Sequence, residues 1–470
     1  MLAEIKGLNE ECGVFAIWGH KDAASISYYG LHSLQHRGQE GAGIVVSDGE
    51  KLSIHKGNGL VNEVFGSGVL NDLHGKAAIG HVRYATAGGG GLANVQPLLF
   101  RSQTSSLAVA HNGNLVNANQ LKHQLESQGS IFQSTSDTEV LAHLIKRSAY
   151  PRLIDKVMNS LTMLKGAYAF AILTEDEMIV ALDPNGLRPL SLGKLGDAYV
   201  VASETCAFDV IGAKFEREVQ PGEIIRFTDE GMEATQFASS VPRAICSMEY
   251  IYFARPDSNV DEINVHTARK NLGKQLALES PVEADVVTGV PDSSISAAIG
   301  YAETTGIPYE LGMIKNRYVG RTFIQPSQEL REQGVKMKLS AVRGVVEGKR
   351  VVMIDDSIVR GTTSKRIVNM LREAGATEVH VRISSPPIKN PCYYGIDTST
   401  KEELIAATHS IEEMREMMGA DTLAFLSMEG LYNGLGRDKE VSNCGQCVAC
   451  FTGQYPTEIY PDTIHPHDKC

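Results

Sequence analysis

The chain has 470 residues, more than one hydrophobic core ordinarily supports, so two or more domains are expected. Its formal net charge is −12 and it has no long basic run, which argues against a nucleic-acid-binding protein. No apolar run approaches the roughly 18 residues of a membrane helix, and residues 1–11 carry charges where a secretory signal would be apolar. We therefore expect a cytoplasmic protein whose eight cysteines are nucleophiles, metal ligands or buried thiols, and not disulfides.

Short apolar or alternating runs, separated by glycine and aspartate turns, predict strands in the first half of the chain. The predicted strands are 12–17, 43–46, 52–55, 77–85, 107–111, 167–173, 178–182, 199–202 and 223–227. The predicted helices are 23–34, 118–128, 137–147 and 153–164. Runs of strands and helices that are segregated in this way indicate an α+β domain with mostly antiparallel sheets. A change of pattern places its end at about residue 240.

Polar clusters punctuate this half at 36–41, 80–86, 111–114 and 136–139. Each has a structural explanation of its own: an Asn-Gly pair is a common turn, and Ser136 with Glu139 fits a capping box. Together with Cys12, and in this order, the clusters resemble the glutaminase domain of the class II amidotransferases. That family has an N-terminal cysteine and the Ntn-hydrolase fold, so the resemblance implies a four-layer αββα domain over residues 12–240.

Hydrolysis of the glutamine side-chain amide needs a nucleophile, a base and a site for the oxyanion. The resemblance implies that Cys12 is the nucleophile and that the Asn112 side chain and the Gly113 N–H bind the oxyanion. It implies Arg83 and Asp137 as the groups that hold the glutamine carboxylate and ammonium, with Arg37 as a further candidate in the same pocket. The structural alternative for Cys12 is an inert thiol buried before a strand.

Cys12 is not residue 1, so its amine is part of a peptide bond and cannot act as a base. A free α-amino group has a pKa of roughly 7.7–8.0, which suits it to accept the thiol proton. We therefore expect residues 1–11 to be a propeptide that is removed after Glu11.

The second half of the chain predicts an α/β domain with a parallel sheet over residues 241–430. The apolar run 351–354 predicts a strand buried on both faces, followed by a polar turn and an amphipathic helix. A second strand at 284–290 leads into the loop 291–294, and further elements are predicted at 264–278 (helix) and 379–383 (strand). Because ligands bind at the carboxyl ends of parallel strands, both loops should lie at one site.

The turn at residues 355–364 suits a phosphorylated sugar. Gly361 lets the backbone approach a phosphate, and the hydroxyl residues after it, with the N-terminus of the next helix, supply donors. Asp355 and Asp356 suit ribose hydroxyls or Mg²⁺, which prefers carboxylate oxygens. The structural alternative is an ordinary Asp/Ser turn with a threonine N-cap.

This segment resembles the ribose-5-phosphate signature of the type I phosphoribosyltransferases, which bind phosphoribosyl pyrophosphate (PRPP) with magnesium. The resemblance makes 292–294 the pyrophosphate loop, although Ser293 or Ser294 could instead cap the following helix. It implies one Mg²⁺ per subunit, held by Ser293, Asp355 and Asp356. The residues implied to bind PRPP are Asp292, Ser293, Asp355, Asp356, Ser357, Arg360, Gly361, Thr362, Thr363 and Ser364. The polar, basic segment 315–338 resembles the mobile lid of this family, with Gly320 and Gly334 as hinges.

The C-terminal tail, 431–470, carries three cysteines at the two-residue spacing typical of thiolate metal sites. With distant cysteines they could complete an iron–sulfur cluster or a zinc site, and the residues alone do not decide between them. The chain resembles a branch of the glutamine phosphoribosylpyrophosphate amidotransferases that carries one [4Fe–4S] cluster per subunit. The resemblance implies that the cluster ligands correspond to Cys246, Cys392, Cys447 and Cys450. Cys444 is then spare, although a register that uses it stays open.

Nearly the whole chain resembles the glutamine phosphoribosylpyrophosphate amidotransferases, closest to their propeptide-bearing, iron–sulfur type. The resemblance implies 5-phosphoribosylamine formation from glutamine and PRPP, the opening step of de novo purine synthesis, with ammonia passed between the sites. It also implies a homotetramer and feedback inhibition by purine nucleotides. The alternatives are a salvage phosphoribosyltransferase with a decayed N-terminal domain and a PRPP-sensing regulator without turnover. Asparagine synthetase would need an ATP-binding Ser-Gly-Gly loop, which the sequence lacks.

Overall fold

The computed structural model describes residues 12–66, 68–84, 91–103, 105–239, 241–316, 339–398, 400–437 and 445–460. The predicted propeptide, nearly all of the predicted lid including both of its hinge glycines, Cys444 and Cys470 lie outside these residues. No helix in the described part of the chain combines the length and the apolar character that crossing a membrane requires.

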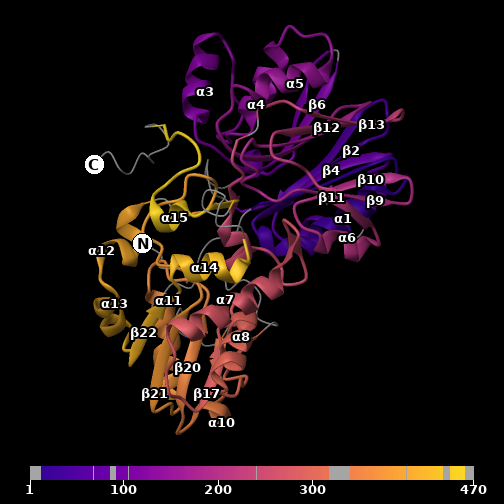
Figure 1. The fold of residues 1–470 in the computed structure, drawn as a ribbon. Coiled ribbons are helices and arrows are strands. Elements are labelled where there is room, and N and C mark those ends of the chain that lie inside the picture. Colours follow the sequence, from indigo (N-terminus) through magenta and orange to yellow (C-terminus); the bar gives the residue numbers. More distant parts are fainter. Residues whose placement is uncertain are drawn as a thin grey trace.

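Two antiparallel sheets stack face to face in the first half of the chain (Figure 1). The first has the strand order β11-β9-β10-β1-β4-β2-β3 and the second has the order β13-β12-β8-β7-β6-β5. The strands of the first are β1 (Gly13–Trp18), β2 (Gly41–Ser47), β3 (Leu52–Asn58), β4 (Ala77–Arg83), β9 (Ser191–Leu195), β10 (Ala198–Ala202) and β11 (Lys214–Glu218). Those of the second are β5 (Leu98–Arg101), β6 (Ser106–Leu115), β7 (Gly166–Leu173), β8 (Met178–Leu182), β12 (Glu223–Thr228) and β13 (Gly231–Gln236).

Alternation along β1 shows how the layers form, because successive side chains of a strand point to opposite faces. Val14, Ala16 and Trp18 pack between the two sheets, and Phe15 and Ile17 pack under helices. The outer face of the first sheet is covered by α1 (Ala23–Ser33), α2 (Val61–Val64) and α6 (Cys206–Ile211). The outer face of the second is covered by α3 (Ala118–Ser127), α4 (Glu139–Arg147) and α5 (Leu153–Leu161). The predicted four-layer αββα arrangement is confirmed.

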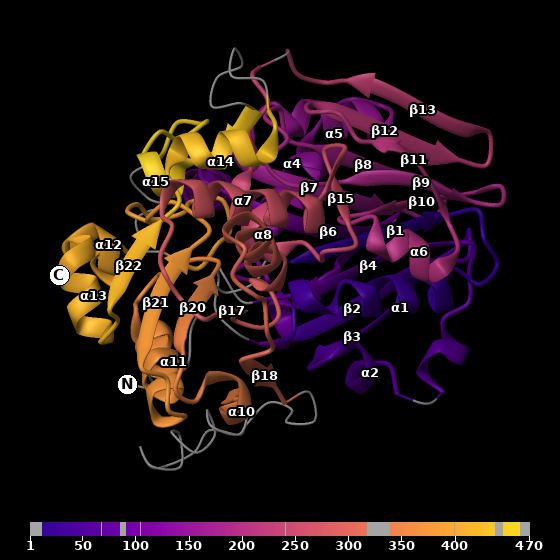
Figure 2. The same cartoon turned by 60° about the horizontal axis from the view of Figure 1, so that its bottom comes forward.

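The second half is built on a parallel sheet with the order β17-β20-β21-β22, as expected for its crossover helices. Its strands are β17 (Val286–Gly289), β20 (Arg350–Asp355), β21 (Glu378–Ile383) and β22 (Thr422–Phe425). One face packs against α7 (Val265–Glu279) and α8 (Ile295–Thr305), and α14 (Met428–Leu435) lies beside α7 (Figure 2). The other face packs against α11 (Thr362–Glu373) and α13 (Ile411–Met418).

Two glycines allow α7 and α8 to approach each other closely. A Cβ on Gly273 would lie 1.9 Å from the Ala297 carbonyl oxygen, and one on Gly300 would lie 1.9 Å from the Lys270 carbonyl oxygen. Neither contact could be relieved by rotating a side chain, since both neighbours are backbone atoms. The pair fixes the position of α8, and with it the loop that precedes α8 at the end of β17.

The tail returns to the boundary between the halves. β23 (Gln446–Cys447) pairs in parallel with β14 (Ile245–Cys246), which places Cys447 opposite Cys246, and α15 (Ala449–Thr452) follows. The remaining helices and strands are short: β15 (Asn259–Val260), β16 (Ile263–Asn264), β18 (Met313–Lys315), β19 (Leu339–Ala341), α10 (Arg343–Val346) and α12 (Ile405–Thr408). One turn of π-helix (Glu249–Phe253) lies just after β14.

Candidate active sites

Cys12 lies at the start of β1, where the first sheet opens toward the second half. β1 pairs with β4, and Gly13 is opposite Val82, so Cys12 lies next to the carboxyl end of β4. Its Sγ is 3.7 Å from the Tyr84 carbonyl oxygen, and its own carbonyl oxygen accepts a hydrogen bond from Arg37 Nε at 3.1 Å. Arg83, the last residue of β4, is buried and pairs with Gly41 of β2. The nucleophile candidate and one of the candidate glutamine-binding groups are therefore neighbours.

The Asn112 side chain lies on β6 in the second sheet and is buried, yet neither its Nδ2 nor its Oδ1 has a hydrogen-bond partner among the described residues. An unsatisfied buried amide costs free energy, so such a group in a native protein calls for a ligand. Gly113 follows with φ of +136°, and a Cβ there would lie 2.1 Å from the Ala167 carbonyl oxygen. Only glycine fits this position.

Hydrogen bonds between the sheets connect these residues. His81 Nε2 of β4 lies 3.0 Å from the His111 carbonyl oxygen of β6, and burial lowers the pKa of His81 to about 3, so this imidazole is neutral. Asp137 Oδ2 accepts from the Leu115 N–H at 2.9 Å and lies 3.7 Å from His111 Nδ1. Burial alone would raise the pKa of Asp137, but His111 and the Leu115 N–H lower it overall, so the carboxylate is charged. An ionised Asp137 suits an ammonium group.

The second site lies where β17 and β20 end side by side. Ser293 Oγ donates to Asp356 Oδ2, and Ser294 Oγ is 3.3 Å from Asp355 Oδ1. Ser357 Oγ donates to Asp356 Oδ1 at 2.7 Å. The serine hydroxyls thus face the acidic pair. The side chains of Ser293 and Ser294 do not cap α8, which was their alternative role. The two loops meet as expected from the parallel sheet.

Burial and the neighbouring carboxylate raise the pKa of Asp355, and burial also raises the pKa of Asp356. Two carboxylates in one buried place disfavour their own ionisation unless a cation joins them. The residues present therefore fit a divalent cation chemically, since they offer adjacent hard oxygen donors. Among the described residues, however, no cluster of three or more His, Cys, Asp or Glu side chains could hold a metal ion, so ligands beyond this pair would come from a serine hydroxyl, water or substrate.

The turn after β20 leads into α11 and opens on a cavity of about 910 Å³. Gly361 has φ of +74° and precedes the helix, whose first residues Thr362, Thr363 and Ser364 line the cavity. Arg360 also lines it and forms an ion pair with Glu403. A helix N-terminus preceded by glycine presents free N–H groups to an anion.

The far wall of this cavity contains residues to which the sequence analysis gave no role. It includes residues 252–256, the guanidinium-bearing Arg269 and, from the first half of the chain, His36. Arg269 is buried, donates to the Tyr250 and Ala254 carbonyl oxygens, and lowers the pKa of Asp356 by its charge. In the sequence, Arg269 is one basic residue within a predicted helix. The sequence alone does not show that it is buried and not at the surface.

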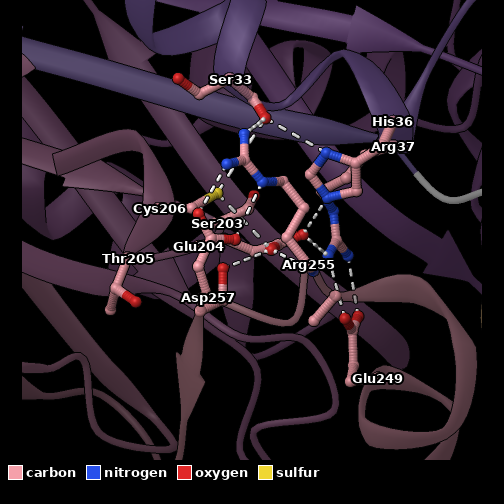
Figure 3. A network of polar contacts seen from close by, with 12 residues as sticks. Ser33, His36, Arg37, Ser203, Glu204, Thr205, Cys206, Glu249, Arg255 and Asp257 are labelled. Atoms are coloured by element: carbon pink, nitrogen blue, oxygen red, sulfur yellow. Dashed lines mark hydrogen bonds and ion pairs between the residues drawn. The ribbon is translucent and has the colours of Figure 1, made fainter. Parts of the chain in front are cut away.

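A buried network of ion pairs links the two sites (Figure 3). The Arg37 guanidinium donates to Glu204 Oε1 at 2.7 Å, and to Glu249 Oε2 and Oε1 at 2.9 and 2.8 Å. Glu204 also accepts from His36 Nε2 at 2.6 Å. Although burial raises the pKa of Glu204, its His36, Arg37 and Ser258 partners lower it overall. Arg37 thus joins Cys12 to two carboxylates, and His36 next to it reaches the cavity.

Four cysteines gather around a small cavity at the junction of the tail with both halves of the chain. The residues that line it are Leu187, Arg188, Cys246, Cys392, Tyr394, Ile396, Cys447, Ala449, Cys450 and Tyr455. Burial raises the pKa of Cys447 to about 12 and raises the pKa of Cys450 well above its usual value. Thiolates in such a place require a metal to offset the loss of hydration. Within the described residues, no group of three or more His, Cys, Asp or Glu side chains is placed to hold a metal ion.

These features define a class: a class II glutamine amidotransferase domain joined to a phosphoribosyltransferase domain. A family model described as a glutamine amidotransferase domain matches residues 85–210. The chain is 77% identical over 470 residues to the amidophosphoribosyltransferase of Bacillus subtilis, covering 99% of it, and 55% identical to that of Staphylococcus aureus, covering 92%.

Two solved structures agree with these relatives. The structure described as the allosteric regulatory enzyme of purine biosynthesis has a TM-score of 0.94 and 76% identity, and covers 97% of this chain and 99% of its own. The Bacillus subtilis glutamine PRPP amidotransferase complexed with ADP and GMP has a TM-score of 0.93 and 75% identity, and covers 97% of this chain and 100% of its own. The chain therefore belongs to the amidophosphoribosyltransferase family, and its activity is that of this allosteric enzyme of purine biosynthesis.

Proposed function

We propose that the protein converts glutamine, water and PRPP into glutamate, 5-phosphoribosylamine and pyrophosphate. The observation that carries this proposal is the contact between the sites: Arg37 binds the Cys12 carbonyl oxygen, and the adjacent His36 lines the cavity that contains Asp355 and Asp356. Ammonia released at Cys12 therefore has a short way to the phosphoribosyl site. An assay with glutamine, PRPP and Mg²⁺ should give glutamate and pyrophosphate in equal amounts, and unequal amounts would contradict the proposal.

In the first site, the Cys12 thiol attacks the side-chain amide carbon of glutamine. Asn112 Nδ2 and the Gly113 N–H stabilise the oxyanion, in keeping with the lack of another partner for the Asn112 amide among the described residues. Arg83 binds the glutamine carboxylate, and the charged Asp137 binds its ammonium. Arg37 uses its guanidinium on the Cys12 carbonyl oxygen and two carboxylates, so we assign it to positioning the nucleophile and not to binding glutamine.

The base for Cys12 is its own α-amino group, which exists only after residues 1–11 have been removed. We expect the intact mass of the purified active enzyme to correspond to a chain that begins at Cys12. A Cys12→Ala variant should keep the mass of the full chain, because the thiol that would cleave the Glu11–Cys12 bond is gone. An active enzyme that retains residues 1–11 would contradict this expectation.

In the second site, Asp355 and Asp356 bind the ribose hydroxyls, and the loop 361–364 with the N-terminus of α11 binds the 5-phosphate. Ser293 and Asp292 lie on the pyrophosphate side. Mg²⁺, when bound through Ser293, Asp355 and Asp356, neutralises the leaving pyrophosphate. The protein itself positions C1 of the ribose, and no protein nucleophile is needed there. The predicted lid, 315–338, would exclude water from this centre.

The four cysteines of the junction cavity, Cys246, Cys392, Cys447 and Cys450, would hold a [4Fe–4S] cluster. Because β14 and β23 are joined only by two paired residues, the cluster would supply structural links between the tail and both halves. Cys447→Ser, purified under nitrogen, should contain little of the iron and sulfide of the parent and should melt at a lower temperature. Cys206→Ser is the matched control, since Cys206 is buried in α6 away from the junction and should leave the iron content unchanged. A parent protein loaded with zinc would contradict the cluster.

Purine nucleotides are the expected feedback inhibitors, because the related Bacillus subtilis structure is a complex with ADP and GMP. The family resemblance also favours a homotetramer in the cytoplasm. We propose domain limits of 12–240 and 241–430 with the tail at 431–470. The first limit is supported by the end of the paired sheets at Gln236, while the limit at 430 falls within α14 (Met428–Leu435).

A further inference from the structure

Glu204 is a fully buried carboxylate at the contact between the two halves of the chain. Its Oε1 accepts from His36 Nε2 at 2.6 Å and from Arg37 Nη1 at 2.7 Å. Its Oε2 accepts from Ser258 Oγ at 2.6 Å and from the backbone N–H of Arg255 at 2.9 Å. Two of these donors belong to the first half and two to the second, so the buried Glu204 joins the halves by hydrogen bonds (Figure 3).

One arm of this network ends at the nucleophile. The Arg37 guanidinium that donates to Glu204 also donates from its Nε to the Cys12 carbonyl oxygen at 3.1 Å. Arg37 is buried, so its electrostatic interactions are weakly screened and a change at Glu204 is felt strongly. The Arg37 guanidinium therefore holds the backbone of Cys12, which carries both the thiol and the amine.

The other arm ends at the phosphoribosyl cavity. His36 and Arg255 both line that cavity. The His36 Nδ1 lies 3.2 Å from the Ser33 carbonyl oxygen while its Nε2 faces Glu204, so both ring nitrogens have an oxygen partner. A polyanion in the cavity competes with Glu204 for the His36 ring and with Asp257 for the Arg255 guanidinium, whose backbone N–H binds Glu204.

We propose that Glu204 is a positioning residue that couples occupation of the phosphoribosyl cavity to the orientation of Cys12. The inference rests on the proposed function of the two sites. When PRPP draws the His36 ring and the Arg255 guanidinium toward the cavity, the His36 Nε2 and the Arg255 backbone N–H shift away from Glu204. Glu204 then binds Arg37 more tightly, which changes the hold on the Cys12 carbonyl. Linkage makes the coupling of binding free energies reciprocal, so reversible occupation of the Cys12 site should in turn alter the affinity for PRPP.

The test is the rate at which iodoacetamide alkylates Cys12 in the enzyme from which residues 1–11 have been removed. The rate is measured with and without PRPP and Mg²⁺. Glutamine and ammonium are left out, so PRPP is not consumed by turnover. In the parent enzyme PRPP should change the rate by about fivefold or more. In Glu204→Gln, which keeps the shape and removes the charge, the ratio should be close to one. Ammonia-dependent activity should persist in this variant, which shows that it folds and binds PRPP.

Glu218→Gln is the matched control. Glu218 is also a nearly buried carboxylate of the first half that binds the second, through Arg243 Nη2 at 3.1 Å and the Asp261 N–H at 2.5 Å. Neither of these partners lines the phosphoribosyl cavity. This variant should keep the PRPP response of the parent, because it loosens the same contact between the halves without touching His36 or Arg37.

A PRPP response in Glu204→Gln equal to that of the parent would overturn the inference, and so would an equal loss in Glu218→Gln. The parent's failure to respond to PRPP would overturn it too. If Glu204→Gln does not fold, His36→Gln replaces it: this side chain is partly exposed, and its loss cuts the arm toward the cavity while the Arg37–Glu204 pair stays. Equal yields of glutamate and pyrophosphate in the parent would show that the proposed function stands even where the coupling fails.

Discussion

Cys12→Ala should lose glutamine-dependent formation of phosphoribosylamine by about 10³-fold or more, because no other group in the first site can form the covalent intermediate. The same variant should keep its ammonia-dependent rate, since Asp355, Asp356 and the 361–364 loop do not use the thiol. Pyrophosphate release with glutamine and with ammonium chloride as alternative nitrogen donors is the measurement.

The ammonia-dependent rate is the control within the same sample, because it reports folding and PRPP binding together. A loss of the glutamine-dependent rate much smaller than this expected factor would show that a group other than Cys12 is the nucleophile. Loss of both activities would mean that Cys12 is needed for the structure of the second site. That outcome would contradict the division of the chain into two chemical centres.

Asp355→Asn should lower both the glutamine-dependent and the ammonia-dependent reaction by roughly 10²-fold or more, since it removes a charge on which the cation and ribose depend. Glutamate formation at Cys12 should not fall by the same factor. Pyrophosphate and glutamate measured in one reaction separate the two effects. Asp285→Asn is the control, because Asp285 pairs with Arg350 at the opposite end of β20 and should leave turnover unchanged.

Asp355→Asn should also stabilise the folded protein when magnesium and PRPP are absent. Burial and the neighbouring carboxylate raise the folded-state pKa of Asp355, so between its unfolded pKa of roughly 3.9 and its raised value the folded state binds more protons. Unfolding free energy therefore falls as pH rises through that window, and asparagine removes the penalty. At pH 7 the melting temperature should rise by a few degrees, with a flatter pH dependence than the parent. A lower melting temperature would contradict the idea that the Asp355 charge destabilises the folded state.

Much of the second site could be predicted because its chemistry is local in the sequence. Residues 351–364 contain the strand, the acidic pair, the phosphate turn and the helix start within one stretch. Their meeting with 292–294 followed from the parallel sheet, which places the carboxyl ends of β17 and β20 side by side. Here periodicity and topology agree, so the fold of this half was confirmed.

The contacts between the halves could not be predicted in the same way. Glu204 accepts hydrogen bonds from His36, 168 residues away, and from the Ser258 hydroxyl, 54 residues away. The local sequence pattern does not specify such a partner, because it does not distinguish a buried glutamate from an exposed one. The His36 cluster was noticed for its composition, yet its role as a wall of the other site depends on the packing of the two halves.

Local rules failed where tertiary contacts offered a better partner. The capping box that was the structural alternative for Ser136 and Glu139 is absent from the start of α4, which begins at Glu139 without a side-chain cap. The Glu139 carboxylate instead accepts from the Gln133 and Ser134 N–H groups, and so closes the preceding loop. Short strands such as β9 and β22 were also missed, since few apolar residues alternate within them.

The account depends on ammonia passing from Cys12 to the ribose without mixing with the solvent. The direct measurement uses glutamine labelled with ¹⁵N in its amide, together with PRPP, Mg²⁺ and an excess of unlabelled ammonium. Mass spectrometry of the trapped phosphoribosylamine should show the label retained in most of the product formed at early times. A label diluted to the ratio of the bulk ammonia pool would show that the two centres act separately, and would contradict the account.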